Sequence, residues 1–260
     1  MFEINEFVLY FWESNIYKMK KTILLFSLIF TLFAVKAQDK KVAVVTFNTD
    51  KIIGFSDLGI GSEEMLTKVL KLRDNPDFDL TPILEKFHTK FFNKYSKEFP
   101  FKILDEKVVL SNEDYKAYIP KFEKSEEALK RFAVYEGYKL IHEGFMGKAN
   151  EVAVANIFKD SAQGVMFVTI SFDLVKGFGL GGVATVKMRA KARIALYNSE
   201  GKNVYVIKEG ANSKKSSVMV KGIPVMSTKK ILPMCESASE KLMKDLKKKL
   251  PKIIRKTSKL

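Results

Sequence analysis

The sequence predicts an α/β (α+β) fold, with a mixed, largely antiparallel β-sheet, helices on both faces and a long C-terminal amphipathic helix. Two observations lead to this prediction. Between Gly164 and Ser213, apolar and polar residues alternate with a period of two, which is typical of consecutive antiparallel strands with one buried face. On both sides of this region, apolar residues recur three and four positions apart, as they do in amphipathic helices.

The clearest strand runs from Val186 to Leu196. Its even-numbered residues are apolar, and its other face carries four cations, Lys187, Arg189, Lys191 and Arg193. The stretch from Met166 to Leu174 has the same period, and Val204 to Ile207 forms a shorter β-branched run. The sequence therefore predicts three strands, joined by a loose glycine-rich connection over 177–182 and a tight hairpin over 198–201.

The segments before this region alternate between strand and helix patterns. Lys41 to Phe47 is a near-continuous apolar run, which is typical of a central strand covered on both faces. Further elements are expected in chain order: a helix over 62–72, a helix over 82–97, a strand over 101–104, a helical turn over 111–118, and helices over 125–142 and 148–159.

The end of the chain predicts one irregular segment and one helix. Residues 214–230 are polar and basic without a firm period, and Pro224 argues against a central strand there. From Pro233, apolar residues step by four along one helix face (Met234, Ala238, Leu242, Leu246 and Leu250). Pro251 is expected to end this helix, which leaves 251–260 as a basic tail.

The N-terminus has the pattern of a secretory signal peptide over 19–37. A basic head, Met19-Lys20-Lys21, precedes 14 uncharged residues and a cleavage site before Gln38. The uncharged run is shorter than the roughly 18 to 20 residues of a membrane-spanning helix, so export is favoured over a permanent anchor. Residues 1–18 are interpreted as an upstream extension, and 38–250 as one domain. No cysteine follows the cleavage site to accept a lipid.

Composition limits the classes of protein. Removal of 1–37 takes away four of the 45 Lys and Arg and three of the 30 Asp and Glu, which leaves a net charge of +14. This charge favours anionic partners without specifying one, and no specific nucleic-acid motif is present. The one cysteine, Cys235, excludes an internal disulfide framework and is expected to be a small buried hydrophobe.

Each candidate catalytic motif lacks a residue, a charge or a spacing that its chemistry requires. Gly59-Ile60-Gly61 precedes Glu63 and Glu64, whose carboxylates would repel a phosphate. Residues 54–59 miss the spacing of a nucleophile elbow. His142-Glu143 lacks the second histidine of a zinc-protease helix, and His88 is expected at the edge of a helix face. The sequence therefore predicts a protein that is not an enzyme and has no metal or other cofactor.

The row of Lys187, Arg189, Lys191 and Arg193 is the most specific chemical feature. Alternate residues of a strand lie about 6.6 to 6.8 Å apart, so the four cations extend over roughly 20 Å. Three interpretations stay open: a solvated sheet face balanced by acidic side chains from neighbouring strands or a covering segment, a binding face for an anionic partner, and the lining of a water-filled pore.

The order of the predicted elements resembles that of the curli secretion channel family, and the same order occurs in the N-terminal domain of the Tol-Pal translocation protein. Ala162 to Val168 is similar to that superfamily's alanine-aspartate-glycine-apolar strand entry, with Gln163 in place of the aspartate. Tyr197 to Val204 is similar to its polar-turn-glycine hairpin. The resemblance implies a mixed sheet with helices on both sides, in an envelope protein that binds or assembles and does not catalyse.

The sequence thus leads to two expectations for function. The first is an exported, non-catalytic binding or scaffold protein of the periplasm or cell envelope, whose partner is an anionic envelope component or another envelope protein. The alternative is an oligomeric outer-membrane secretion or assembly component of the curli-channel type. The candidate binding residues are Lys187, Arg189, Lys191 and Arg193.

Overall fold

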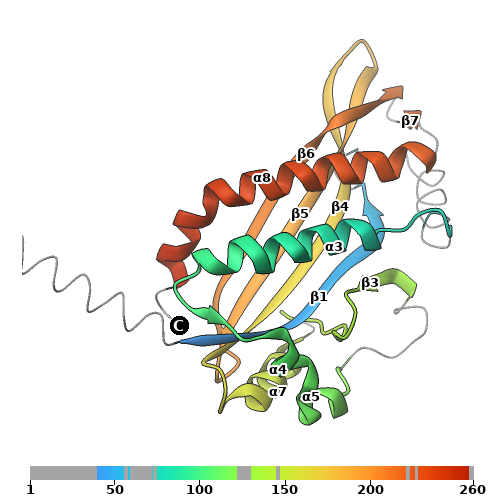
Figure 1. Cartoon of the computed structure of the whole chain (residues 1–260). Coiled ribbons are helices and arrows are strands. Elements are labelled where there is room, and N and C mark those ends of the chain that lie inside the picture. Colours follow the sequence, from blue (N-terminus) through green and yellow to red (C-terminus); the bar gives the residue numbers. More distant parts are fainter. Residues whose placement is uncertain are drawn as a thin grey trace, which may run out of the picture.

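A computed structural model describes residues 40–55, 58, 72, 75–121, 130–144, 147–220, 223–225 and 228–257. The fold combines helices with one mixed β-sheet, consistent with the α+β class (Figure 1). The predicted signal peptide, the upstream extension, Gly59-Ile60-Gly61 and most of the helix expected over 62–72 lie outside the described residues.

The sheet has seven strands in the order β2-β1-β4-β5-β6-β7, and β3 pairs with β1. β1 is parallel to β2 and β4, and the other pairings are antiparallel. The strands are β1 (Lys41–Gly54), β2 (Lys102–Ile103), β3 (Phe132–Val134), β4 (Gly164–Leu180), β5 (Val183–Asn198), β6 (Asn203–Val220) and β7 (Ile223–Val225).

The two faces of the sheet carry separate hydrophobic cores. On one face, even-numbered residues of β5 such as Met188 pack with Phe87 of α3 (Thr81–Lys90) and Leu242 of α8 (Ile231–Thr257). On the other, Ala195 and Tyr197 join residues of α4 (Glu106–Ser111), α5 (Glu113–Ala117) and α7 (Lys148–Phe158). Figure 1 shows α3 and α8 lying across the sheet, with α4, α5 and α7 gathered at its lower end.

The strand expected over Lys41 to Phe47 extends further, to Gly54. Val42 to Phe47 are buried, as expected for a strand with a core on each side. The helix expected over 82–97 continues from α3 as a π-helical segment, Phe91–Tyr95, and a 3-10 segment, Ser96–Glu98. The helical turn expected over 111–118 forms α5, which is capped by Asn112. A short helix that was not expected, α4, precedes it and is capped by Asp105.

The helix expected over 125–142 is wrong beyond Arg131, while Lys130 and Arg131 themselves are helical. Phe132 to Val134 form β3, which pairs with β1 at Asn48 to Asp50, and the described residues from Tyr135 to Gly144 are not helical. β2 is short and covers only the start of one edge of β1, so the backbone groups further along that edge would be unpaired without β3. The aromatic and β-branched residues of β3 suit a strand at this position. Residues 122–129 of the expected helix lie outside the described residues.

The irregular segment expected after Lys214 is also wrong. β6 continues to Val220, and Pro224 pairs with Met219 through β7. The period is hidden because the register shifts between Ser216 and Asn212, where a bulge inserts extra residues. Pro224 is tolerated because β7 is the last strand of the sheet.

The connection between β4 and β5 is tighter than expected. Leu180 pairs with Val183, so Gly181 and Gly182 alone form the turn, with φ of 60° and 83°. Two residues with positive φ make the type of turn that matches the twist of hairpin strands, and glycine adopts it without steric cost.

The C-terminal helix passes the proline that was expected to end it. α8 extends to Thr257 with Pro251 inside it, although a proline has no backbone N–H to donate to the preceding turn. Most of the expected basic tail is therefore helical backbone. No helix in the described part of the chain is both long and apolar enough to cross a membrane.

Candidate functional site: a basic face of the sheet

The four predicted site residues lie on one face of β5, and we call this face, with Lys208 of β6, the basic face. Residues directly opposite each other in an antiparallel pair point to the same side of the sheet. Arg193 faces Lys208 of β6, Lys191 faces Gly210, and Lys187 faces Ser216. The sheet thus brings a fifth cation beside the four that the alternation predicts.

Arg193 is held by a carboxylate from the segment that follows β3. Its Nε and Nη2 atoms donate to the two oxygens of Glu143, the latter at 2.8 Å, and the Tyr197 hydroxyl donates to Glu143 as well. The Glu143 side chain is 10% exposed, and that of Arg193 is 35% exposed. This ion pair therefore holds the Arg193 side chain in place at one end of the basic face.

The pKa of Glu143 shows which effect dominates at this pair. Burial alone would raise the pKa of this carboxyl. The hydrogen bonds from Arg193 and Tyr197, with the positive charge of Arg193, outweigh burial and hold the pKa below its ordinary value. The guanidinium pKa of Arg193 is raised for the same reason. Both groups are therefore charged at neutral pH.

The next two cations also have partners on neighbouring strands. The Lys191 ammonium forms an ion pair with Asp173 of β4. Arg189 Nε donates to Asn212 Oδ1 of β6 at 2.9 Å. Asp173 and Glu143 are acidic partners of the kind that the solvated interpretation expects, one from a neighbouring strand and one from a covering segment.

A groove of about 550 Å³ opens on the basic face. Four cationic side chains line it, those of Arg189, Lys191, Arg193 and Lys208, together with Ser171 on β4. Glu209 also belongs to the lining, but it pairs with the buried Ala192, so its carboxylate points to the opposite side of the sheet. Lys187 does not line it and lies further along β5. The groove has the size of small-molecule sites in proteins, and its charge suits phosphate or carboxylate groups.

Two charged residues of the groove lining were missed by sequence reasoning. Lys208 and Glu209 lie just after Val204 to Ile207, where the expected third strand ends, and β6 continues through them. Aligning β6 with β5 from the closing pair Tyr197–Asn203 would have placed Ile207 opposite Arg193, and only the register shift before the pair Leu196–Tyr205 brings Lys208 there.

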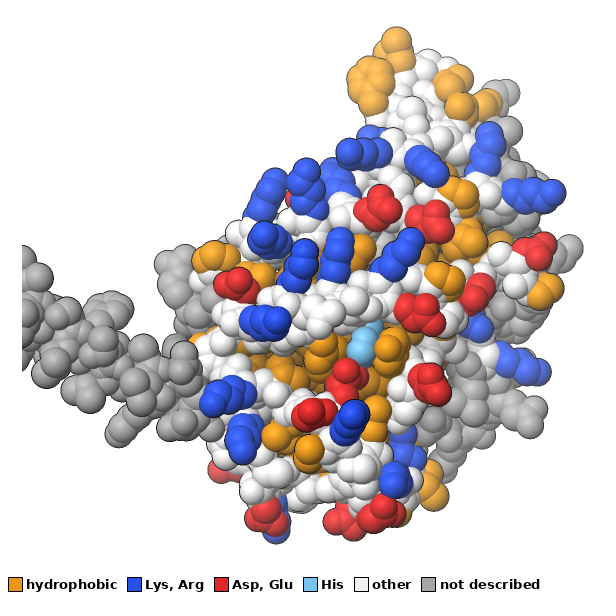
Figure 2. Space-filling model, in the orientation of Figure 1, with side chains coloured by type: hydrophobic (Ala, Val, Ile, Leu, Met, Phe, Trp, Pro, Cys, Tyr) orange, Lys and Arg blue, Asp and Glu red, His pale blue; other side chains and the backbone are white. Residues whose placement is uncertain are grey.

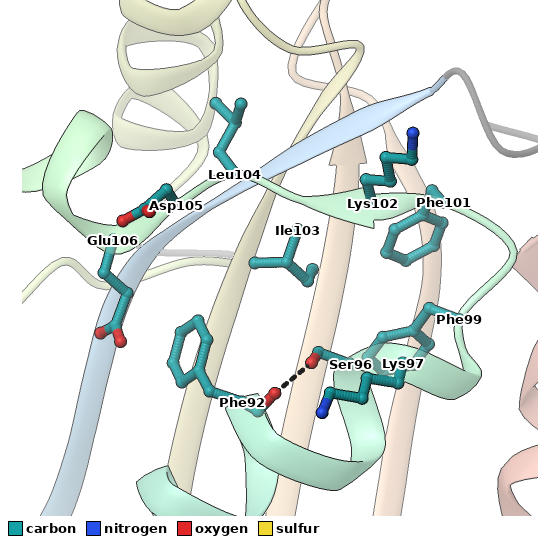
Figure 3. A pocket seen from close by; sticks show the side chains of 10 residues that line it. All are labelled: Phe92, Ser96, Lys97, Phe99, Phe101, Lys102, Ile103, Leu104, Asp105 and Glu106. Atoms are coloured by element: carbon teal, nitrogen blue, oxygen red, sulfur yellow. Dashed lines mark hydrogen bonds between the residues drawn. The ribbon is translucent and has the colours of Figure 1, made fainter.

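A second cavity, of about 580 Å³, lies between the segment after α3 and β2 (Figure 3). Phe92 and Ile103 line its middle, and Figure 3 shows Asp105 and Glu106 toward one end, with Lys97, Lys102 and Phe101 toward the other. Because its two carboxylates balance its two lysines, this cavity is a poorer candidate for an anion than the basic groove with its four cations.

His88 belongs to the core beside this second cavity. Its ring stacks on Tyr135 with centroids 3.6 Å apart, and its Nε2 lies 2.7 Å from Glu106 Oε1. Tyr138 donates to the same Glu106 oxygen at 2.8 Å. Expected at a helix edge, His88 is buried instead, and its hydrogen bond to Glu106 accounts for it structurally.

Cys235 is fully buried, and burial raises the pKa of its thiol, so it stays a neutral thiol as a small buried hydrophobe does. Within the described ranges, no three His, Cys, Asp or Glu side chains are grouped to hold a metal ion.

Comparison of the chain with protein-family models, curated proteins and solved structures found no match. The resemblance to the curli secretion channel family therefore stays a prediction from the sequence.

Proposed function

We propose that this protein is an exported, non-catalytic binding or scaffold protein of the cell envelope, and that its basic face contacts an anionic partner. The observation that carries the proposal is the groove lined by the side chains of Arg189, Lys191, Arg193 and Lys208. The signal-peptide pattern over 19–37 and the resemblance to envelope proteins support the location.

The ion pairs of the basic face support binding because they fix side chains and leave donors for a partner. A guanidinium has five N–H donors, and the pair with Glu143 uses two of those of Arg193. An ammonium has three, and Asp173 receives one from Lys191. Side chains that are already ordered lose less conformational entropy when a partner binds.

The test removes positive charge from the basic face and keeps the ion pair of Arg193 with Glu143. In the variant Lys187→Gln/Lys191→Gln/Lys208→Gln, both arginines and the Glu143 pair remain. The matched control, Lys241→Gln/Lys244→Gln/Lys247→Gln, removes the same charge from exposed positions of α8, which packs on the opposite face of the sheet.

Polyphosphate immobilised on a resin serves as the anionic probe, and the salt concentration that elutes each protein is measured. Binding through several cations weakens steeply with salt, because exposed charges are screened over about 8 Å at physiological ionic strength. We expect the basic-face variant to elute at clearly lower salt than the wild type and the α8 control to elute close to the wild type. Equal shifts in both variants would contradict the proposal, since only total charge would then matter.

A further inference from the structure

The outer end of the sheet, where β4, β5 and β6 project past the body of the molecule, carries an unusual set of exposed apolar side chains. Of the eight large apolar residues that are exposed in the described part of the chain, five lie here: Phe178, Leu180, Val183, Val218 and Val220. We call this set the apolar tip. Figure 2 shows hydrophobic side chains gathered at this projecting end.

The register places the apolar tip on the same side of the sheet as the basic face. Val183 pairs with Leu180 and Val220, and Thr185 pairs with Val218, so all point to the side of Lys187. Phe178 accepts a hydrogen bond from the Thr185 hydroxyl at its backbone oxygen, which places it beside that residue. One surface therefore passes from the basic groove, through Lys187, to an apolar end.

The opposite side of the same strands is covered. Ala184 and Met219 are buried and belong to the core beneath α3 and α8. Phe178 and Leu180 are each 83% exposed. Keeping such large side chains in water is unfavourable, by about 25 cal/mol for each Å² of apolar surface that a partner would cover. The exposure is thus a property of one face rather than of a generally loose hairpin.

Positive charge surrounds the base of the apolar tip, and the described parts of β4, β5 and β6 that form the tip carry no Asp or Glu. Lys176, Lys187, Lys214 and Lys215 lie where the three strands leave the body. The sequence has no Asp or Glu between Asp173 and Glu200, and none from Gly210 to Val220. Figure 2, which views the side of the sheet that carries α3 and α8, shows Lys and Arg side chains directly below the projecting end, with Asp and Glu further down.

The lysines at 214 and 215 are held in place by the bulge of β6. The Ser213 hydroxyl accepts a hydrogen bond from the backbone N–H of Met188 at 3.1 Å, and the backbone N–H of Lys214 donates to the Ser237 hydroxyl of α8 at 3.1 Å. The bulge therefore joins β6 to β5 and α8 at the level where the charge begins.

We propose that this end of the sheet docks on an anionic lipid bilayer, with the apolar tip in the headgroup and upper acyl region and the lysines around it on the lipid phosphates. This inference rests on the proposed function and names the partner of the basic face. An apolar end followed by cations matches the two layers of a membrane interface, and each Lys or Arg near an anionic surface adds about tenfold or less to the affinity.

The length of the apolar tip decides between docking on a bilayer and crossing it. The charge-free stretches are four residues at 177–180, four at 183–186 and five at 216–220. A strand that spans a bilayer needs about 9 to 11 residues. Lys187 lies four residues behind Val183, about 13 Å at strand spacing, which fits the roughly 5 to 10 Å burial of interfacial segments. Shallow insertion fits these lengths, and a lining of a pore does not.

The test places a fluorescent reporter in the apolar tip of the full chain. The one tryptophan of the sequence, Trp12, is replaced by Trp12→Phe, and Phe178→Trp introduces the reporter. Ile119→Trp is the matched control, because Ile119 is also highly exposed, at 82%, but lies on the body after α5. A site-specific reporter is needed because the uncharged run at 22–35 can bind lipid by itself.

The two proteins are titrated with vesicles of phosphatidylglycerol and phosphatidylcholine and with vesicles of phosphatidylcholine alone. We expect the emission of the Phe178→Trp protein to shift to shorter wavelength with anionic vesicles and to be quenched by brominated acyl chains, while the Ile119→Trp protein changes little. Adding Lys187→Gln/Lys191→Gln/Lys208→Gln should weaken the Phe178→Trp response on the order of 100-fold in lipid concentration.

Each of the other possible outcomes contradicts a particular part of the proposal. An equal response to neutral vesicles removes the role of charge. A short-wavelength emission without lipid that depends on protein concentration means that a second copy of the chain covers the apolar tip. No response to anionic vesicles, with polyphosphate retention still dependent on the basic face, overturns the lipid partner and leaves the proposed function intact. Loss of both results overturns the proposed function as well.

Discussion

At the residue scale, Arg193 and Lys191 lie on the same face of β5 but have different roles. Arg193 is tied to a largely buried carboxylate that also accepts from Tyr197. Lys191 pairs with Asp173 at a more exposed position, and its own side chain is 49% exposed. Exposed ion pairs contribute little to stability, whereas breaking a buried pair leaves a charge without a partner. Arg193 therefore stabilises the fold, and Lys191 remains the better target for a binding variant.

We predict that Arg193→Gln lowers the free energy of unfolding by about 1 to 3 kcal/mol, less than the roughly 3 to 5 kcal/mol of a fully buried pair because Arg193 is partly exposed. Lys191→Gln is the control and should cost about 1 kcal/mol or less. Urea unfolding followed by circular dichroism measures both. Equal losses in the two variants would show that the Glu143 pair has no special role.

The lowered pKa of Glu143 gives this pair a pH dependence. A carboxyl whose pKa is lower in the folded protein adds stability above its unfolded pKa, about 4.3, and loses it as the pH falls through the folded pKa. We expect the stability difference between the wild type and Glu143→Gln to be constant from pH 7 to about 5 and to shrink below about pH 4. A difference that grows on acidification would contradict this assignment.

At the scale of elements, strands with one buried face were predictable and their ends were not. The alternation in β4 and β5 depends on a core beneath one face, and the sequence records it residue by residue. The bulge at 213–215 breaks the period of β6, and its hydrogen bonds to Met188 and Ser237 come from segments far away in the chain. β3 was missed because three residues cannot show a period, and its pairing depends on the open edge of β1.

The packing of α8 provides the test at this scale. Leu242 and Leu246 are buried in the core shared with β5 and β6. We predict that truncating either residue to alanine costs about 2 to 5 kcal/mol, because a cavity remains where the side chain was. Lys244→Ala, at an exposed position of the same helix, should change stability by no more than about 0.5 kcal/mol. A loss below about 0.5 kcal/mol for both leucines would mean that this face of α8 does not pack on the sheet.

At the scale of the whole molecule, the sequence predicted a basic protein with a cationic strand face, but not how the charge is distributed around that face. The basic groove needs Lys208 from β6, Ser171 from β4 and Glu143 from the segment after β3, and only the folded sheet brings these together. The apolar tip was hidden for a similar reason. Its residues come from three strands, and a register is needed to show that they share one side.

Lysine footprinting of the protein in isolated cell envelopes tests the central claim most directly, because it requires no knowledge of the partner. Amines are acylated in the envelope fraction and on the purified protein, and modification at each lysine is compared by mass spectrometry. If the basic face holds an anionic partner, Lys187, Lys191 and Lys208 are protected in the envelope, while Lys241, Lys244 and Lys247 of α8 react as they do in the purified protein. Protection of the α8 lysines with unchanged reactivity at the basic face would contradict the account.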